Sequence, residues 1–105
     1  MTDFAFTSAV ELARLIAVRA VSPVEIVDAV LARIERSQPA LNAFITVCAD
    51  EARAAARAAE TAIMRGGPLG PLHGVPFAVK DLVNTAGVRT TFGSVALADN
   101  VPAAD

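Results

Sequence analysis

Hydrophobic and polar positions follow two different patterns along this chain. Through residues 1–65, apolar side chains recur every three or four positions, a spacing that predicts amphipathic helices packed by one face. From Gly66 onward, glycine and proline interrupt the chain, and the apolar residues come in short continuous runs. The pattern therefore predicts a mainly helical segment over residues 1–65, followed by loops and short strands over residues 66–105.

The start of the second helix carries the clearest local signal. The letters SPVE at residues 22–25 place a capping hydroxyl, a proline in the first turn and a glutamate where a capping box needs it. An apolar stripe follows through residues 26–34, and we expect the helix to end at the Ser-Gln-Pro of residues 37–39. An earlier helix is expected behind a cap at Thr7 or Ser8.

Two apolar runs have the composition of buried strands. Residues 42–48 are β-branched and aromatic, and residues 75–79 read VPFAV, with Pro76 near the start where a strand tolerates it best. An alanine-rich helix is expected between them, over residues 50–64. Helices and strands together favour an α/β fold, but so few strands cannot form a covered sheet. We therefore expect a fold that is incomplete on its own.

Composition narrows the class of protein. The 105 residues are 54% hydrophobic and 19% charged, with a formal net charge of −2, which argues against a disordered tail and against direct binding of nucleic acid. No apolar stretch reaches the ~18 residues of a membrane-spanning helix, and Asp3 stands where a secretory signal is basic. Cys48 is the only cysteine, so we expect no disulfide and a cytoplasmic protein. His73 is the only histidine, so we expect no metal site of the usual Cys/His type. No cofactor is expected.

Lysine occurs once among nine basic residues, at Lys80. It follows the apolar run 75–79 and precedes Asp81, so a buried strand would place its ammonium at the strand end, where α/β sites usually form. Burial disfavours the charged form of a lysine and lets it act as a base, whereas arginine stays protonated. Two plainer interpretations stay open: the side chain reaches solvent, or it pairs with Asp81.

The glycine-punctuated half of the chain resembles the amidase signature family. GPLHGVPFAVKD at residues 70–81 resembles the family's G-P-L-H-G-[VI]-P-x-x-[VI]-K-D, and GVRTTFGS at residues 87–94 resembles its G-V-x-T-T-x-G-S. The order and spacing agree, and the upstream helices are also similar, so the resemblance covers the whole chain. Phe92 departs from the pattern, because a small residue is commoner there.

The resemblance implies an α/β fold, with N-terminal helices plus the first strands of a mixed sheet. Residues 1–105 would be the N-terminal part of a single amidase domain, with a mainly helical segment over 1–65 and the start of the catalytic core over 66–105. It also implies a serine amidase with a Ser–Ser–Lys triad. One serine attacks the amide carbonyl, a second serine on a cis peptide relays the proton, and the lysine that matches Lys80 is the base. Both serines belong to a downstream segment that residues 1–105 do not match.

The remaining motif residues are expected to support the site. They are His73, Gly74, Asp81, Thr90, Thr91, Gly93 and Ser94. His73 is interpreted as a loop residue, with acid–base work as the alternative, and Asp81 as an anchor of its turn or a support for Lys80. The hydroxyls of the 90–94 segment suit hydrogen bonds to loop backbone, with substrate contact as the alternative.

Three functions remain open at this point. The resemblance favours an amidase acting on a small-molecule amide, with residues 1–105 inactive by themselves because they lack the nucleophile. A glutamine-dependent tRNA amidotransferase subunit is the alternative within the family. A non-catalytic helical interaction module is the alternative outside it, although it leaves Lys80 unexplained. The implied partners are the remainder of the amidase polypeptide and either a second copy of the protein or an amidotransferase complex.

Overall fold

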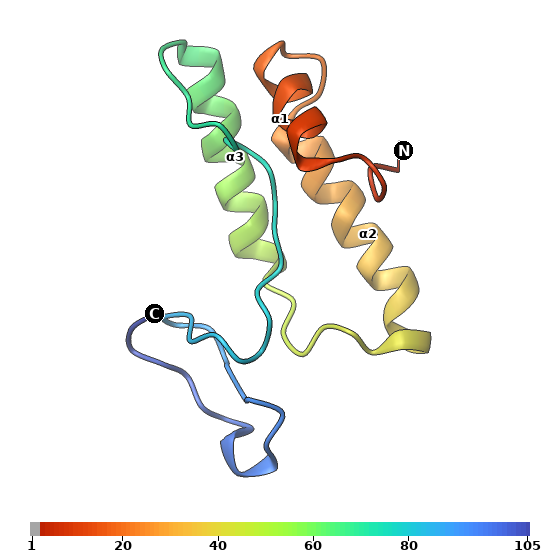
Figure 1. Ribbon diagram of the computed structural model, residues 1–105, viewed down its shortest axis with the longest axis vertical. Coiled ribbons are helices and arrows are strands. Elements are labelled where there is room, and N and C mark those ends of the chain that lie inside the picture. Colours follow the sequence, from red (N-terminus) through yellow and green to blue (C-terminus); the bar gives the residue numbers. More distant parts are fainter. Residues whose placement is uncertain (1–2) are drawn as a thin grey trace. The chain divides into compact units, whose positions relative to one another are not determined.

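The computed structural model describes residues 3–105 and contains three α-helices and one short 3-10 helix (Figure 1). The helices are α1 (Ala9–Ala17), α2 (Pro23–Leu41), α3 (Ala49–Arg65) and η1 (Val95–Leu97). The described chain divides into two compact units. The helical unit comprises residues 3–43 and 48–76, and the second unit comprises residues 44–47 and 77–105. None of the helices within residues 3–105 is both long and apolar enough to span a membrane.

Serine caps begin the first two helices. Ser8 accepts an N–H of the first turn of α1 at 3.1 Å, which decides between the two candidate caps. The capping box predicted for α2 is confirmed, since Ser22 accepts an N–H at 3.0 Å and Glu25 accepts the Ser22 N–H at 2.9 Å. The Ser22 hydroxyl also donates to Glu60 of α3 at 2.6 Å, so one residue both caps α2 and joins it to α3.

The core of the helical unit is small and entirely aliphatic. Leu12 and Ile16 of α1, Ile26 of α2 and Ile63 of α3 are buried against one another, and Ile26 is 0% exposed. Val75 packs against this cluster as a partly buried neighbour, so the chain that follows α3 returns to the same core. In Figure 1, α2 and α3 lie side by side, which is the arrangement that their apolar faces require.

The second helix ends later than the sequence predicts. Its expected end at residues 37–39 is wrong, because α2 continues through Pro39 to Leu41. Proline removes a single backbone N–H and disturbs the preceding turn, and within the last turn of α2 this is not enough to end the helix. The residue at the end is Asn42, which adopts a left-handed conformation with φ of 45°. Asparagine is the commonest residue after glycine for such an end.

Neither predicted strand is present in residues 3–105. Residues 42–48 and 75–79 form no strand ladder, and an isolated bridge between Thr85 and Val88 is the sole β-pairing of the described chain. The first strands of a mixed sheet are therefore not confirmed by this structure. A strand needs a neighbour for its backbone N–H and C=O groups, and the described residues provide none. The run 75–79 is not buried either, since Phe77 is 86% exposed.

Loop contacts hold the second unit together. The backbone N–H of Gly87 donates to the carbonyl of Pro102, and the N–H of Thr90 donates to the carbonyl of Asn100, both at 2.9 Å. The Asn100 side chain donates back to the Thr90 carbonyl at 2.9 Å. These bonds tie the start of the second motif to the last residues of the chain and fix the loop that follows Lys80.

Candidate active site

Lys80 lies at a tight turn in the second unit. Its carbonyl accepts the N–H groups of Leu82 at 2.7 Å and Val83 at 3.0 Å, so the backbone of the lysine is fixed. Its side chain is exposed and forms no hydrogen bond or ion pair with residues 3–105. Of the two plainer interpretations, exposure to solvent agrees with this structure and pairing with Asp81 does not. The burial expected from a strand is not provided by the described residues.

The carboxylate of Asp81 is bound to a segment ten residues away. Its Oδ1 accepts the backbone N–H of Thr91 at 2.7 Å, and its Oδ2 accepts the Thr91 hydroxyl. The same hydroxyl accepts the N–H of Gly93 at 3.2 Å. The structure therefore brings three of the predicted motif residues together, and it joins the turn after Lys80 to the turn at residues 91–94.

These contacts lower the pKa of Asp81. The largest cause is the hydrogen bond from the Thr91 hydroxyl, followed by the bond from the Thr91 N–H. Partial burial acts in the opposite direction, and the positive charge of Arg89 makes a small further contribution to the lowering. Each donor favours the ionised carboxylate, so Asp81 is negatively charged at neutral pH.

We expect the contact between Asp81 and Thr91 to be lost only in acid. Because the pKa of Asp81 is lowered from an ordinary value of 3.8, its stabilising contribution is complete above that value and is lost as the pH falls through the lowered value. The amide proton shift of Thr91, followed by NMR from about pH 6 to about pH 2, should therefore change with a midpoint below the ordinary value. In Thr91→Val, which lacks the hydroxyl, the midpoint should rise toward 3.8. A wild-type midpoint at or above 3.8 contradicts the contact.

The turn at residues 91–94 has positive φ at both central positions. Phe92 has φ of 54° and Gly93 has φ of 69°, and the N–H of Ser94 donates to the Thr91 carbonyl at 2.9 Å. Left-handed backbone is unfavourable for a bulky side chain, which is a physical reason why Phe92 is an unusual residue at this position. Thr90, just before the turn, is 2% exposed, and its hydroxyl donates to the Val88 carbonyl at 3.1 Å.

His73 and Gly74 lie in the helical unit. The Nε2 of His73 is 2.9 Å from the carbonyl oxygen of Ala59, and since a carbonyl can only accept, the ring nitrogen donates. This bond fastens the loop to α3 and favours the interpretation of His73 as a loop residue. Gly74 has φ of 81°, and a Cβ at this position would stand 2.8 Å from Cγ of Pro23.

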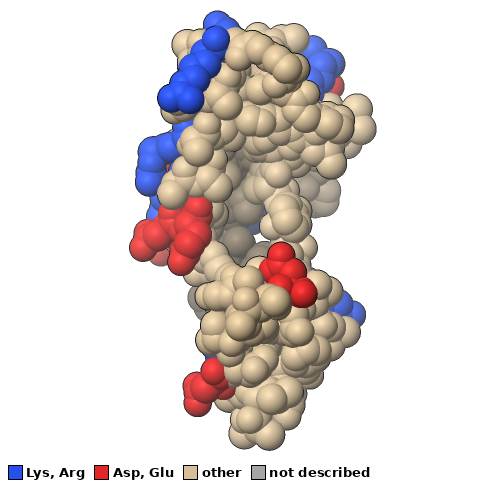
Figure 2. All heavy atoms as spheres, turned by 90° about the vertical axis from the view of Figure 1, so that its left-hand side faces the viewer, with Lys and Arg blue, Asp and Glu red and all other residues tan. Residues whose placement is uncertain are grey.

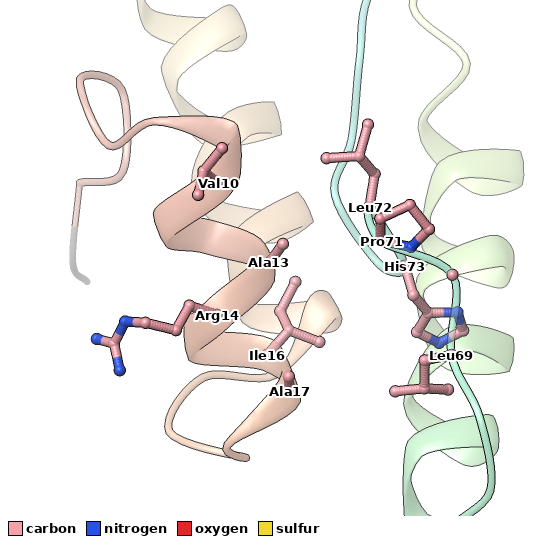
Figure 3. A pocket seen from close by; sticks show the side chains of 10 residues that line it. Val10, Ala13, Arg14, Ile16, Ala17, Leu69, Pro71, Leu72 and His73 are labelled. Atoms are coloured by element: carbon pink, nitrogen blue, oxygen red, sulfur yellow. The ribbon is translucent and has the colours of Figure 1, made fainter.

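A groove of about 500 Å³ lies between α1 and the loop at residues 69–73 (Figure 3). Its walls are mainly apolar, and Figure 3 shows the Arg14 side chain directed away from the loop, where it pairs with Glu11 at 2.7 Å. No hydroxyl, thiol or carboxylate side chain lines the groove, and His73, which does line it, bonds through Nε2 to the Ala59 carbonyl. Within residues 3–105, no group of three His, Cys, Asp or Glu side chains could hold a metal ion.

The family model described as Amidase matches residues 25–105 of this chain. The chain belongs to the amidase family. Among curated relatives, it is 48% identical to a glutamyl-tRNA(Gln) amidotransferase subunit of Anaeromyxobacter dehalogenans, over 94% of this chain and 22% of that one. It is 52% identical to the protein of the same name from Geobacter sulfurreducens, over 90% of this chain and 19% of that one.

A solved structure agrees with the family assignment. The crystal structure of a bacterial aryl acylamidase of the amidase signature family superposes with a TM-score of 0.87 and 40% identity, covering 94% of this chain and 21% of that chain. The resemblance that was based on residues 70–94 is thus confirmed for the family. The chain spans about a fifth of the length of the curated relatives that it matches.

The contact between Asp81 and Thr91 could not be predicted from the sequence. Both residues belong to the motifs, but a contact across an irregular loop has no periodic signature. The close approach of Pro23 to Gly74 was not predicted either, although each residue belongs to a motif of the sequence. The sequence signal for this contact is the glycine itself, because a residue without a side chain allows another chain segment to approach closely.

Proposed function

We propose that this chain is the N-terminal portion of a single amidase domain that breaks a carboxamide bond through a Ser–Ser–Lys triad, with Lys80 as the general base. The observation that carries the proposal is the match of residues 25–105 to the amidase family, with Lys80 at the motif position of the base. The fixed turn at Lys80, joined through Asp81 to the second motif segment, supports it. Membership of the family disfavours a non-catalytic interaction module.

In this proposal the rest of the polypeptide covers the surface around Lys80. Apolar side chains on both sides of the lysine are exposed in the described chain: Phe77 by 86%, Val79 by 47%, Leu82 by 53% and Val83 by 57%. On the face shown in Figure 2, residues other than Lys, Arg, Asp and Glu make up most of the surface. Exposed apolar side chains such as Phe77 and Val83 are typical of a face that packs against further structure. The mixed sheet of the proposed amidase core would form there.

Covering this surface would give Lys80 the environment that a base requires. An amine removed from water loses its preference for the charged form and can accept a proton. In the proposed reaction, one serine oxygen bonds to the amide carbon while its proton passes through the second serine to the Lys80 amine. The proton is then returned to the nitrogen as the carbon–nitrogen bond breaks and ammonia or an amine leaves. Lys80 then accepts a proton from a water molecule, which attacks the resulting serine ester and releases the carboxylic acid.

A second candidate is an amidotransferase subunit that releases ammonia from glutamine for transfer to tRNA-bound glutamate. The names of the curated relatives, at 48% and 52% identity, favour it. The 40% identity to an aryl acylamidase favours a free-standing hydrolase, so the two candidates share the amide-breaking step and differ in the fate of ammonia. The amidotransferase would assemble with partner subunits, whereas the hydrolase would act as a monomer or a homodimer.

We expect amide turnover by the full-length protein and none by the 105 residues alone. The full-length protein should release ammonia from L-glutamine or an aromatic amine from a simple anilide, since the triad is then complete. Glutamine turnover that is stimulated by glutamyl-tRNA and partner subunits supports the amidotransferase, and anilide turnover without partners supports the hydrolase. Turnover by the purified 105-residue chain contradicts the division of the triad between this chain and the remainder.

A further inference from the structure

We propose that Asp81 and Thr91 act together as positioning residues for Lys80. The Asp81 carboxylate, held by the turn at residues 91–94, fixes the peptide that joins it to Lys80 and so sets where the lysine side chain projects. This inference rests on the proposed function, which makes Lys80 the base, and it gives the second motif segment a task in the reaction.

The backbone of Lys80 is held on its C-terminal side. The Lys80 carbonyl accepts two N–H groups at 2.7 Å and 3.0 Å, which closes the turn that follows it. The next side chain, Asp81, accepts the Thr91 N–H at 2.7 Å and the Thr91 hydroxyl. A residue fixed at its carbonyl and at the neighbouring side chain has little freedom to rotate its own Cα–Cβ direction. The direction in which the Lys80 side chain leaves the backbone is therefore coupled to Thr91.

Thr91 is buried, and hydrogen bonds fix both its backbone and its side chain. It is 5% exposed, and its N–H and its hydroxyl both bond to Asp81. The N–H of Gly93 donates to the Thr91 hydroxyl oxygen at 3.2 Å, which occupies a lone pair and leaves the hydroxyl proton for Asp81. The turn thus orients the hydroxyl, and the hydroxyl orients the carboxylate.

The arrangement acts through position and not through an ion pair. In the part of the chain that the structure describes, the ion pairs are Arg14–Glu11, Arg33–Asp3 and Arg53–Asp28, and Lys80 takes part in none of them. The negative charge of Asp81 is directed at the Thr91 donors. A defect in this contact should therefore misplace the base, which lowers kcat, and leave substrate binding, and so KM, nearly unchanged.

The decisive experiment is Thr91→Val in the full-length protein. Valine keeps the shape of threonine and removes the hydroxyl, so we expect kcat for amide turnover to fall by about a hundredfold with little change in KM. Thr91→Ser restores the hydroxyl and should recover most of kcat. Thr61→Val makes the same change on α3, where the hydroxyl donates to the Arg57 carbonyl at 3.0 Å, and it should retain wild-type kcat.

A purely structural role gives a different result. Thr91→Val would then lower the thermal midpoint, while kcat per folded molecule would match the wild type, and that outcome overturns the positioning role. Should Thr91→Val fail to fold, Asp81→Glu provides the second arm, since it keeps the charge but moves the carboxylate by one methylene. Wild-type kcat in Asp81→Glu likewise overturns the proposal. Full activity in Lys80→Ala overturns the proposed function itself, and the positioning role with it.

Discussion

Replacing Lys80 by alanine in the full-length protein is expected to abolish amide turnover. The alanine side chain cannot accept the proton of the attacking serine, so the hydroxyl remains a weak nucleophile at neutral pH. General-base catalysis contributes about a hundredfold to ten-thousandfold, so kcat should fall by at least about a thousandfold when the base also returns the proton to the leaving nitrogen. Release of ammonia or of an aromatic amine, followed against time, measures the loss.

Two further variants separate the loss of the base from other effects. Lys80→Arg keeps the positive charge and much of the length, but a guanidinium stays protonated, so it should be as inactive as the alanine variant. Arg65→Ala removes an exposed cation at the end of α3 and should leave turnover at the wild-type level. Activity of Lys80→Ala within tenfold of the wild type contradicts the assignment of the base.

The parts of the fold that depend on local chemistry could be predicted from the sequence. The caps at Ser8 and Ser22 need only neighbouring residues, and both are present. The apolar stripe of α2 likewise placed Ile26 in the core. The predicted end of α2 at residues 37–39 was wrong, because the helix continues through Pro39 and ends at Asn42, which has a left-handed backbone.

The strands could not be predicted correctly because strand formation is not local. The run 75–79 has the composition of a strand, but its backbone needs a partner segment, and Phe77 at 86% exposure shows that its face is uncovered in this chain. The predicted burial of Lys80 is absent for the same reason, because it depends on the same missing neighbours. The candidate site could be located from the motif, whereas the link from Asp81 to Thr91 required the path of the loop.

Two segments that the sequence singled out separately meet in the core of the helical unit. Pro23, in the first turn of α2, is fully buried, and it lies where the side chain of residue 74 would project. The histidine before that position donates to the Ala59 carbonyl of α3 at 2.9 Å. The loop that leads toward Lys80 can thus pack closely against α2 because residue 74 has no side chain, and a hydrogen bond joins it to α3. The helical half of the chain therefore fixes the start of the motif segment.

Gly74→Ala is accordingly expected to destabilise the protein by about 3 kcal/mol, the sum of left-handed strain and overpacking. Its φ of 81° disfavours any Cβ, and that Cβ would stand 2.8 Å from Cγ of Pro23 and 3.3 Å from Cδ1 of Ile16. Gly87→Ala has the strain alone, with φ of 74° and nothing within 4 Å, and should cost about 1 kcal/mol. Gly70→Ala has neither and should be close to neutral. The free energy of unfolding of the full-length protein, from urea denaturation, measures all three, and equal values for Gly74→Ala and Gly87→Ala contradict the close packing against Pro23.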